Sequence, residues 1–66
     1  QREWEGMERA VLDAETAAEA CRQALEDPGI AADPAALQAR YAALEAAHGE
    51  VTRLYTRWAE LEAKQV

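Results

Sequence analysis

One glutamate and one histidine of this sequence stand at a spacing that helical metal sites use. The segment Glu45-Ala-Ala-His48 has the Glu-x-x-His pattern of carboxylate-bridged metal centres in helical bundles. Such centres need a second copy of the motif and further inward-pointing carboxylates, yet His48 is the only histidine of the chain. We therefore interpret His48 as a partly buried histidine of a helix contact and predict no metal site.

The single cysteine is a second candidate for chemistry. Cys21 has one basic neighbour, Arg22 beside it in the chain, whereas reactive thiols lie in electropositive surroundings. Its place on an apolar stripe favours a small core residue, and one cysteine excludes a disulfide within the chain. The sequence also has no phosphate-binding glycine loop, no nucleophile beside a base and no zinc cluster. We therefore predict that this chain is not an enzyme and holds no catalytic, cofactor-binding or metal-binding residue.

Basic residues beside aromatic residues are the third candidate. Five of the seven basic residues gather at one end of the expected fold, beside Trp4, Tyr55 and Trp58. These candidate nucleic-acid contacts are Arg2, Arg9, Arg53, Arg57 and Lys64. Cations can bind phosphates, and aromatic rings beside them can stack on bases. Acidic residues share the region, namely Glu3, Glu5, Glu8, Glu60 and Glu62. The competing interpretation is therefore a coiled-coil surface with many salt bridges and with its aromatic rings in the core.

Two prolines divide the chain into the elements that would position these residues. Pro28 cannot lie inside a helix and pushes Asp27 out of the α-helical region, so a first helix must end near there. Asp33 before Pro34 indicates a helix start, because the aspartate can cap free N–H groups and proline suits the first helical position. The predicted elements are a first helix over about residues 2–27, a turn over 28–33 and a second helix over about 34–64. The scarcity of β-branched residues argues against a sheet.

Each predicted helix carries an apolar stripe with the repeat of a coiled coil, in steps of three and four residues. On the first helix the stripe comprises Trp4, Met7, Val11, Ala14, Ala18, Cys21 and Leu25. On the second helix it is wider and comprises Leu37, Tyr41, Leu44, Ala47, Val51, Leu54, Tyr55, Trp58 and Leu61. The short connection makes the two helices antiparallel neighbours. The predicted fold class is all-α, a two-helix antiparallel coiled-coil hairpin that forms a single domain over residues 1–66.

Counting outward from the turn predicts the register of this hairpin. The predicted pairs are Leu25 with Leu37, Cys21 with Tyr41, Ala18 with Leu44, Val11 with Val51, Met7 with Leu54 and Tyr55, and Trp4 with Trp58. Small residues then oppose large ones, as in interdigitating core layers. We expect Ala14, Ala17 and Ala18 to let the helices approach closely. The same register sets Arg9 opposite Arg53 and Arg2 opposite Glu60.

Length and composition limit what such a hairpin can do. Seventeen of its 33 hydrophobic residues are alanine, which adds little area to a core, so we expect no pocket that encloses a substrate. The net charge of −6 weighs against non-specific binding of nucleic acid. The sequence has no membrane-spanning apolar run and no signal-peptide pattern, so we expect a cytoplasmic chain without a membrane partner. Because the chain begins at Gln1 in mid-pattern, we expect a fragment of a longer protein.

Three stretches of the sequence resemble one protein family. They are Gln1-Arg2-Glu3-Trp4-Glu5-Gly6-Met7-Glu8, the turn from Asp27-Pro28 to Ala32-Asp33-Pro34, and Leu54-Tyr55-Thr56-Arg57-Trp58-Ala59-Glu60-Leu61-Glu62. In this order and spacing, over essentially the whole chain, they resemble the C-terminal coiled-coil domain of Uup-type ABC-F proteins. Members of that family are bacterial ATP-binding-cassette proteins with two fused ATPase domains.

The resemblance implies an accessory domain, tethered after the second ATPase domain by a basic linker that would precede Gln1. ATP and Mg²⁺ would bind the ATPase domains of the parent protein, and this chain has none of their motifs. In that family the ATPase domains act on ribosomes or nucleic acid, and the C-terminal hairpin is associated with DNA binding. The positions that match the family pattern look structural, and they are Trp4, Met7, Pro28, Pro34, Tyr55, Trp58 and Leu61.

Two functions therefore compete. In the first, the hairpin assists the parent protein in engaging DNA or the ribosome, and its partners are DNA or ribosomal RNA and the parent's ATPase domains. In the second, it is a protein-interaction coiled coil with no role in nucleic-acid binding, or it associates with itself as a weak homodimer. The wide stripe of the second helix motivates the second hypothesis, because one partner helix leaves part of that stripe uncovered and small cores are marginally stable.

Overall fold

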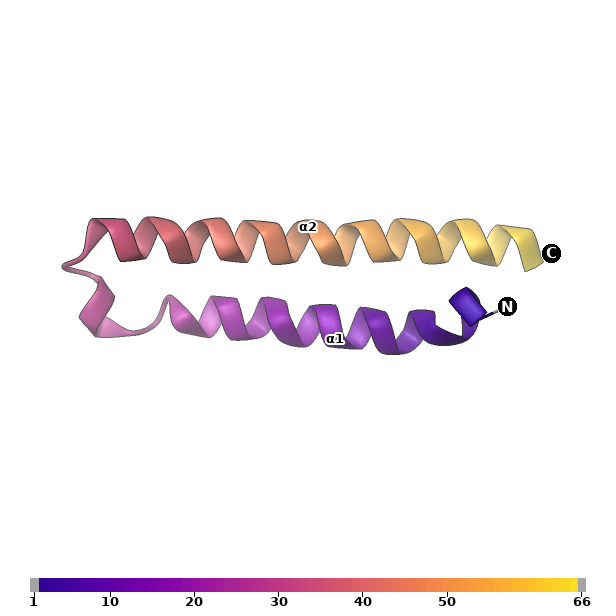
Figure 1. Ribbon diagram of the computed structural model, residues 1–66, viewed down its shortest axis with the longest axis horizontal. Helices are drawn as coiled ribbons and strands as arrows, with labels where there is room; N and C mark the ends of the chain where they lie inside the picture. The colour runs from indigo at the N-terminus through magenta and orange to yellow at the C-terminus, as the bar shows by residue number, and fades with distance from the viewer. Residues whose placement is uncertain (1, 66) are drawn as a thin grey trace.

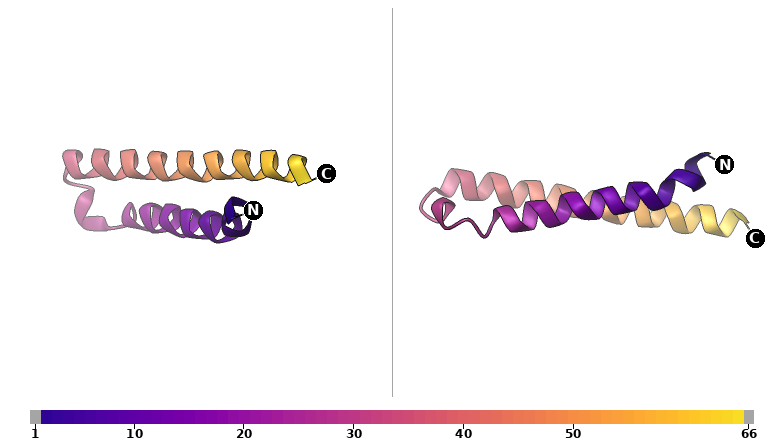
Figure 2. Two further views of the ribbon diagram at one scale, coloured as in Figure 1. Left: turned by 45° about the vertical axis from the view of Figure 1, so that its right-hand side comes forward. Right: turned by 90° about the horizontal axis from the view of Figure 1, so that it is seen from below.

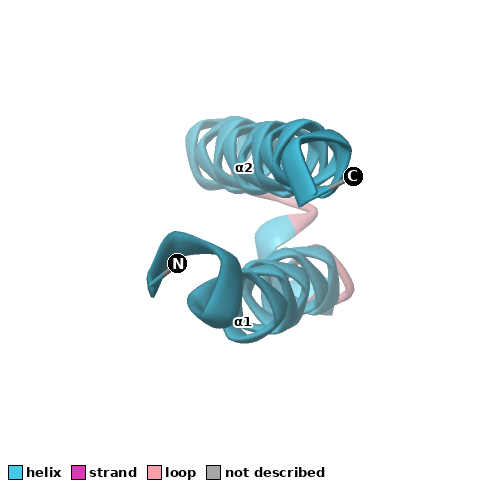
Figure 3. Ribbon diagram, turned by 90° about the vertical axis from the view of Figure 1, so that its right-hand side faces the viewer, coloured by secondary structure: helices cyan, strands magenta, loops and turns pink. Residues whose placement is uncertain are grey.

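Two long helices lie side by side and antiparallel in the computed structural model (Figure 1). The structure describes residues 2–65, and side chains over 3–64. Helix α1 spans Arg2–Ala24, the short 3-10 helix η1 spans Pro28–Ile30, and α2 spans Pro34–Gln65. The described part is a rod of 52 × 14 × 13 Å, and the end-on view shows one helix above the other with both termini at the same end (Figure 3). The predicted all-α antiparallel hairpin is confirmed.

The first helix ends earlier than the prolines predict. Helix α1 stops at Ala24 and does not continue to residue 27. The N–H groups of Leu25 and Glu26 bond to carbonyls three residues back, at 3.1 and 3.0 Å, so the last turn tightens before the chain leaves the helix. Asp27 is extended (φ −67°, ψ 115°), as expected before a proline. Pro28 therefore ends the helix several residues upstream of itself.

Two capping aspartates and one buried residue hold the turn. The carboxylate of Asp27 accepts a hydrogen bond from the Gly29 N–H at 2.9 Å and caps η1. Ile30, which the apolar stripes do not include, is only 6% exposed. The carboxylate of Asp33 accepts from the Ala36 N–H at 3.2 Å, so the predicted cap at the start of α2 is present.

The core lies along the predicted stripe of α1. Met7, Val11 and Leu54 form a buried cluster. All seven positions predicted on α1 are buried or half-buried, and they are Trp4, Met7, Val11, Ala14, Ala18, Cys21 and Leu25. The predicted contact between Trp4 and Trp58 is also present, with ring centroids 6.4 Å apart in an edge-to-face arrangement. The right-hand view of Figure 2 shows that α1 crosses α2 obliquely.

The wider stripe predicted on α2 is only partly buried. Tyr41 and Tyr55 are 57% and 46% exposed, so neither is a core residue as the predicted stripe requires, and the predicted pair of Tyr41 with Cys21 stays a prediction. Ala17 of α1 is exposed too and does not lie in the close contact predicted for it. The reason is that one partner helix covers only a narrow seam. On α2 that seam consists of Leu37, Arg40, Leu44, Ala47, Val51, Leu54, Trp58 and Leu61, all buried or half-buried.

Candidate functional site

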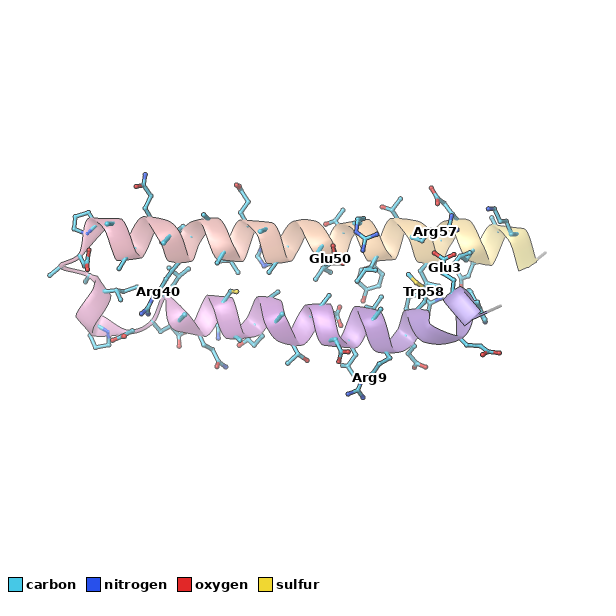
Figure 4. All side chains as sticks on the ribbon, viewed as in Figure 1. Glu3, Arg9, Arg40, Glu50, Arg57 and Trp58 are labelled. Carbon is cyan, nitrogen blue, oxygen red and sulfur yellow. The ribbon has the colours of Figure 1, made fainter. Side chains whose placement is uncertain are left out.

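Arg57 joins the two helices through a bidentate ion pair. Its Nε and Nη2 donate to the two carboxylate oxygens of Glu3 at 2.7 and 2.8 Å, and its Nη1 donates to Glu60 at 3.1 Å (Figure 4). The hydrogen bonds that Glu3 accepts from Arg57 lower the pKa of Glu3, and those that Arg57 donates to Glu3 and Glu60 raise the pKa of Arg57. Arg57, a predicted nucleic-acid contact, therefore links α1 to α2 at the end of the hairpin where the two termini lie, which we call the open end.

Arg9 and Arg53 do not face each other as the register predicts. Arg9 pairs with Asp13 of its own helix at 3.2 Å, and Arg53 pairs with Glu50 of its own helix at 2.6 Å. Their side chains are 78% and 64% exposed, and Figure 4 shows Arg9 pointing away from α2. Both arginines are exposed, and each pairs with a carboxylate of its own helix among the described residues.

The two remaining predicted cations lie near the chain ends. Lys64 is exposed, and its charge contributes to the lowered pKa of Glu3. The side chain of Arg2 lies outside the described residues, and so does its predicted place opposite Glu60. Glu60, which is spaced for a pair with Lys64, accepts a hydrogen bond from Arg57 instead.

The aromatic rings are not arranged for stacking on bases. Nε1 of Trp58 is buried and has no hydrogen-bond partner among the described residues, so this indole belongs to the core. Tyr55 stacks on Trp58 with ring centroids 6.3 Å apart and donates from its hydroxyl to Glu15 at 2.7 Å. That hydrogen bond raises the pKa of Tyr55. Trp4 and Trp58 therefore serve the helix contact, as the competing interpretation predicts, whereas Tyr55 is 46% exposed and does not lie in the core.

His48 and Cys21 differ in their exposure to solvent. His48 is exposed, so the prediction of a partly buried histidine is wrong. Cys21 is half-buried on the α1 stripe. Within the described part of the chain, no three histidine, cysteine, aspartate or glutamate side chains come close enough to hold a metal ion.

Arg40 is a structural residue that the sequence patterns miss. Its Nη1 donates to the carbonyl of Ala24, the last residue of α1, at 2.6 Å and lies 3.5 Å from the carboxylate of Asp27 (Figure 4). A cation there complements the negative end of the α1 dipole and satisfies a carbonyl without a helix partner. The available signal was the place of Arg40 on the α2 seam, between Leu37 and Leu44.

The charges of the hairpin are divided between its two sides. Along one side of α1, Glu15, Glu19 and Arg22 border a groove with His48 of α2. Glu45 borders a neighbouring hollow on α2, which His48 also lines. We define the acidic face as these charged residues together with the charged residues that stand seven or fourteen positions from a lining residue on the same helix. Its members are Glu5, Glu8, Glu15, Glu19, Arg22, Glu26, Glu45 and Glu62.

Seven glutamates and one arginine give the acidic face a formal charge of −6, which equals the net charge of the whole chain. The acids and bases elsewhere on the chain therefore cancel. Four of the predicted nucleic-acid contacts have described side chains, and all four lie outside the acidic face. They are Arg9, Arg53, Arg57 and Lys64. We call the surface outside the acidic face the balanced face. The sequence contains the signal for this division, because the acidic-face glutamates of α1 recur in steps of three, four and seven residues.

Comparison with known proteins gives one match. The model of a family described as the ABC transporter C-terminal domain matches residues 1–63. No curated protein and no solved structure matches the chain. In the described part of the chain, neither long helix is apolar enough along its length to span a lipid bilayer.

Proposed function

The chain belongs to the family of ABC transporter C-terminal domains, which makes it an accessory domain of an ABC protein, and we propose that it helps its parent protein to engage nucleic acid or the ribosome. The hairpin itself is non-catalytic in this proposal. ATP and Mg²⁺ are bound by the ATPase domains of the parent protein, which works in the bacterial cytoplasm.

The division of charge is the observation that carries this proposal. A phosphate backbone is repelled by the acidic face, but it can approach the balanced face, where Arg9 and Arg53 are exposed. Among the described residues, each of these arginines pairs with an exposed carboxylate of its own helix, and such surface pairs contribute little to stability. A phosphate can replace that carboxylate as the partner of the arginine without disturbing the helix contact.

Titration of the 66-residue chain with duplex DNA and with structured RNA, at several salt concentrations, tests this proposal. We expect an affinity that falls as salt rises, because each phosphate contact releases bound counterions. Arg53→Gln should weaken binding to all sequences alike and reduce the salt slope by about one.

Arg22→Gln is the matched control for Arg53→Gln. Both arginines are exposed and pair with a glutamate three residues earlier in the same helix, but Arg22 lies on the acidic face. The control should bind like the unchanged chain. Absence of salt-dependent binding, both by the chain and by the chain fused to a basic linker ahead of Gln1, would refute the proposal.

Self-association is the second candidate function, and the exposed side chains of Leu12 and Tyr41 favour it. Both side chains lie on the same sides of their helices as the acidic-face residues, so contact through them would bring like charges together, and a homodimer should strengthen as salt rises. Light scattering coupled to size-exclusion chromatography measures the mass directly. A mass that stays monomeric at the highest soluble concentration would remove this candidate.

A further inference from the structure

Three exposed residues with rings follow one side of α2 at a spacing of seven. Tyr41, His48 and Tyr55 all lie beside the seam, and the two tyrosines are 57% and 46% exposed. A spacing of seven keeps residues in line along a helix that packs on another helix. The row is therefore arranged as a second seam of α2, in which Tyr41 and His48 are exposed and Tyr55 contacts α1 through its hydrogen bond to Glu15.

Two neighbouring hollows follow this row. The first lies on α2 and is lined by Tyr41, Leu44 and His48, and the second lies between the helices and is lined by Ala18 of α1 with His48 and Val51. His48 borders both hollows, and we call the two together the groove. A groove beside a helix seam, with aligned apolar side chains in its floor, fits a third helix.

Carboxylates form both edges of this groove. Glu15 and Glu19 stand on the α1 side, and Glu45 stands on the α2 side. Glu19 is paired with Arg22, which lines the same hollow. Among the described residues, no arginine or lysine lies within ion-pair distance of Glu45, and Glu15 accepts its hydrogen bond from the neutral hydroxyl of Tyr55. Glu15 and Glu45 therefore keep an unbalanced negative charge that a partner can neutralise.

The charge of the edges decides among the occupants. A second copy seated in the groove through its own acidic face would bring two charges of −6 together. Nucleic acid and anionic lipid are repelled for the same reason. A helix with apolar residues on one side and lysine or arginine on its flanks complements both the floor and the edges. Its arginines can also lie over the exposed ring of Tyr41.

We propose that the groove bordered by Tyr41, His48 and Val51 is a docking site for a basic amphipathic helix of a partner protein. The floor supplies apolar contact, and Glu15 and Glu45 supply the preference for basic flanks. This site is separate from the balanced face and does not depend on nucleic-acid binding by the hairpin.

A synthetic amphipathic peptide tests the proposal, with leucine along one side and lysine on both flanks. Its matched control has glutamate in place of every lysine and the same leucines. Nuclear magnetic resonance of the isotope-labelled chain reports where each peptide binds. We expect the basic peptide to shift the signals of Tyr41, His48 and Tyr55, with an affinity that falls as salt rises, and the acidic peptide to leave them unchanged.

Two substitutions separate docking from general attraction between charges. Tyr41→Ala should weaken binding of the basic peptide about tenfold, because an aromatic anchor is lost from the floor. Glu45→Gln should weaken it about threefold, and Glu50→Gln, an equal charge change on the balanced face, should not.

Three results would overturn the proposal. They are equal losses for Glu45→Gln and Glu50→Gln, full binding by Tyr41→Ala, and signal shifts spread over both faces. The circular dichroism of Tyr41→Ala shows whether the hairpin is intact, and substitution at this exposed position should leave it so.

Discussion

Neighbouring residues of α1 differ sharply in burial. Val11 is 4% exposed, whereas Leu12, beside it in the chain, is 54% exposed. The difference follows from the helical repeat, which turns successive side chains by about 100° and places only one of the two on the seam. Single substitutions should therefore divide sharply into those that unfold the hairpin and those that leave it intact.

Met7→Ala should be among the most damaging substitutions. Met7 is 4% exposed and lies in the buried cluster, so its truncation should lower the free energy of unfolding by about 2–3 kcal/mol. Leu12→Ala is the control and should change it little, because Leu12 loses only exposed surface. Urea denaturation followed by circular dichroism measures both values. Equal losses for the two variants would show that the core does not lie on this seam.

Gly49 offers a stabilising substitution. It lies inside α2, and a Cβ atom added there would meet no atom within 4 Å. Gly49→Ala should raise the free energy of unfolding by up to about 1 kcal/mol, because alanine favours the helix. For a domain of this size that gain raises the midpoint of thermal unfolding by about 4–8 °C. Gly29→Ala should not do the same, since its Cβ would lie 3.3 Å from the capping carboxylate of Asp27. A lower midpoint for Gly49→Ala would contradict this prediction.

At the scale of elements, the turn depends on an arginine of α2. Arg40 donates to the carbonyl of Ala24 and lies close to the carboxylate of Asp27, so it holds the end of α1 and the cap of η1 together. Arg40→Gln should lower the free energy of unfolding by about 1 kcal/mol, a partial loss because the side chain is half-exposed. Arg53→Gln, which removes an exposed pair within one helix, should leave thermal unfolding unchanged. Identical melting curves for Arg40→Gln and the unchanged chain would refute this role.

The pair between Glu3 and Arg57 should make the contact of the two helices sensitive to acid. A carboxylate with a lowered pKa contributes stability that is fully present above its ordinary pKa of 4.5 and is lost as the pH falls through the lowered value. The unchanged chain should therefore exceed Glu3→Gln in stability at about pH 6, and the difference should shrink towards about pH 3.

Glu5→Gln is the control for this acid sensitivity. It removes one charge from the same turn of α1, but Glu5 has no ion pair among the described residues. Urea denaturation at each pH gives the comparison. A difference between Glu3→Gln and Glu5→Gln that stays constant over this range would contradict the prediction.

At the scale of the whole molecule, the two faces should act independently. The acidic face carries a charge of −6, and the charges of the rest of the chain cancel. Arg53→Gln should therefore affect nucleic-acid binding without affecting the basic peptide, and Glu45→Gln should do the reverse. Measuring both ligands with both variants checks this prediction, and the loss of both affinities in either variant would indicate general attraction between charges.

The sequence by itself determined the hairpin and most of its seam. The signals are local: Pro28 and Pro34 each act on a few neighbouring residues, and the steps of three and four residues describe one side of one helix. Such signals do not depend on how the two helices are placed against each other. They also identified the contact between Trp4 and Trp58, because the turn limits the register.

Only the tertiary structure decided which side of the α2 stripe is covered and which carboxylate each arginine binds. Tyr41, His48 and Tyr55 carry the same periodic signal as core residues, but their exposure depends on where α1 lies across α2. Arg40 reaches the end of α1 because the two helices bring residues 24 and 40 together. Contacts of this kind depend on the separation and crossing of both helices, and no pattern within a single helix contains that information.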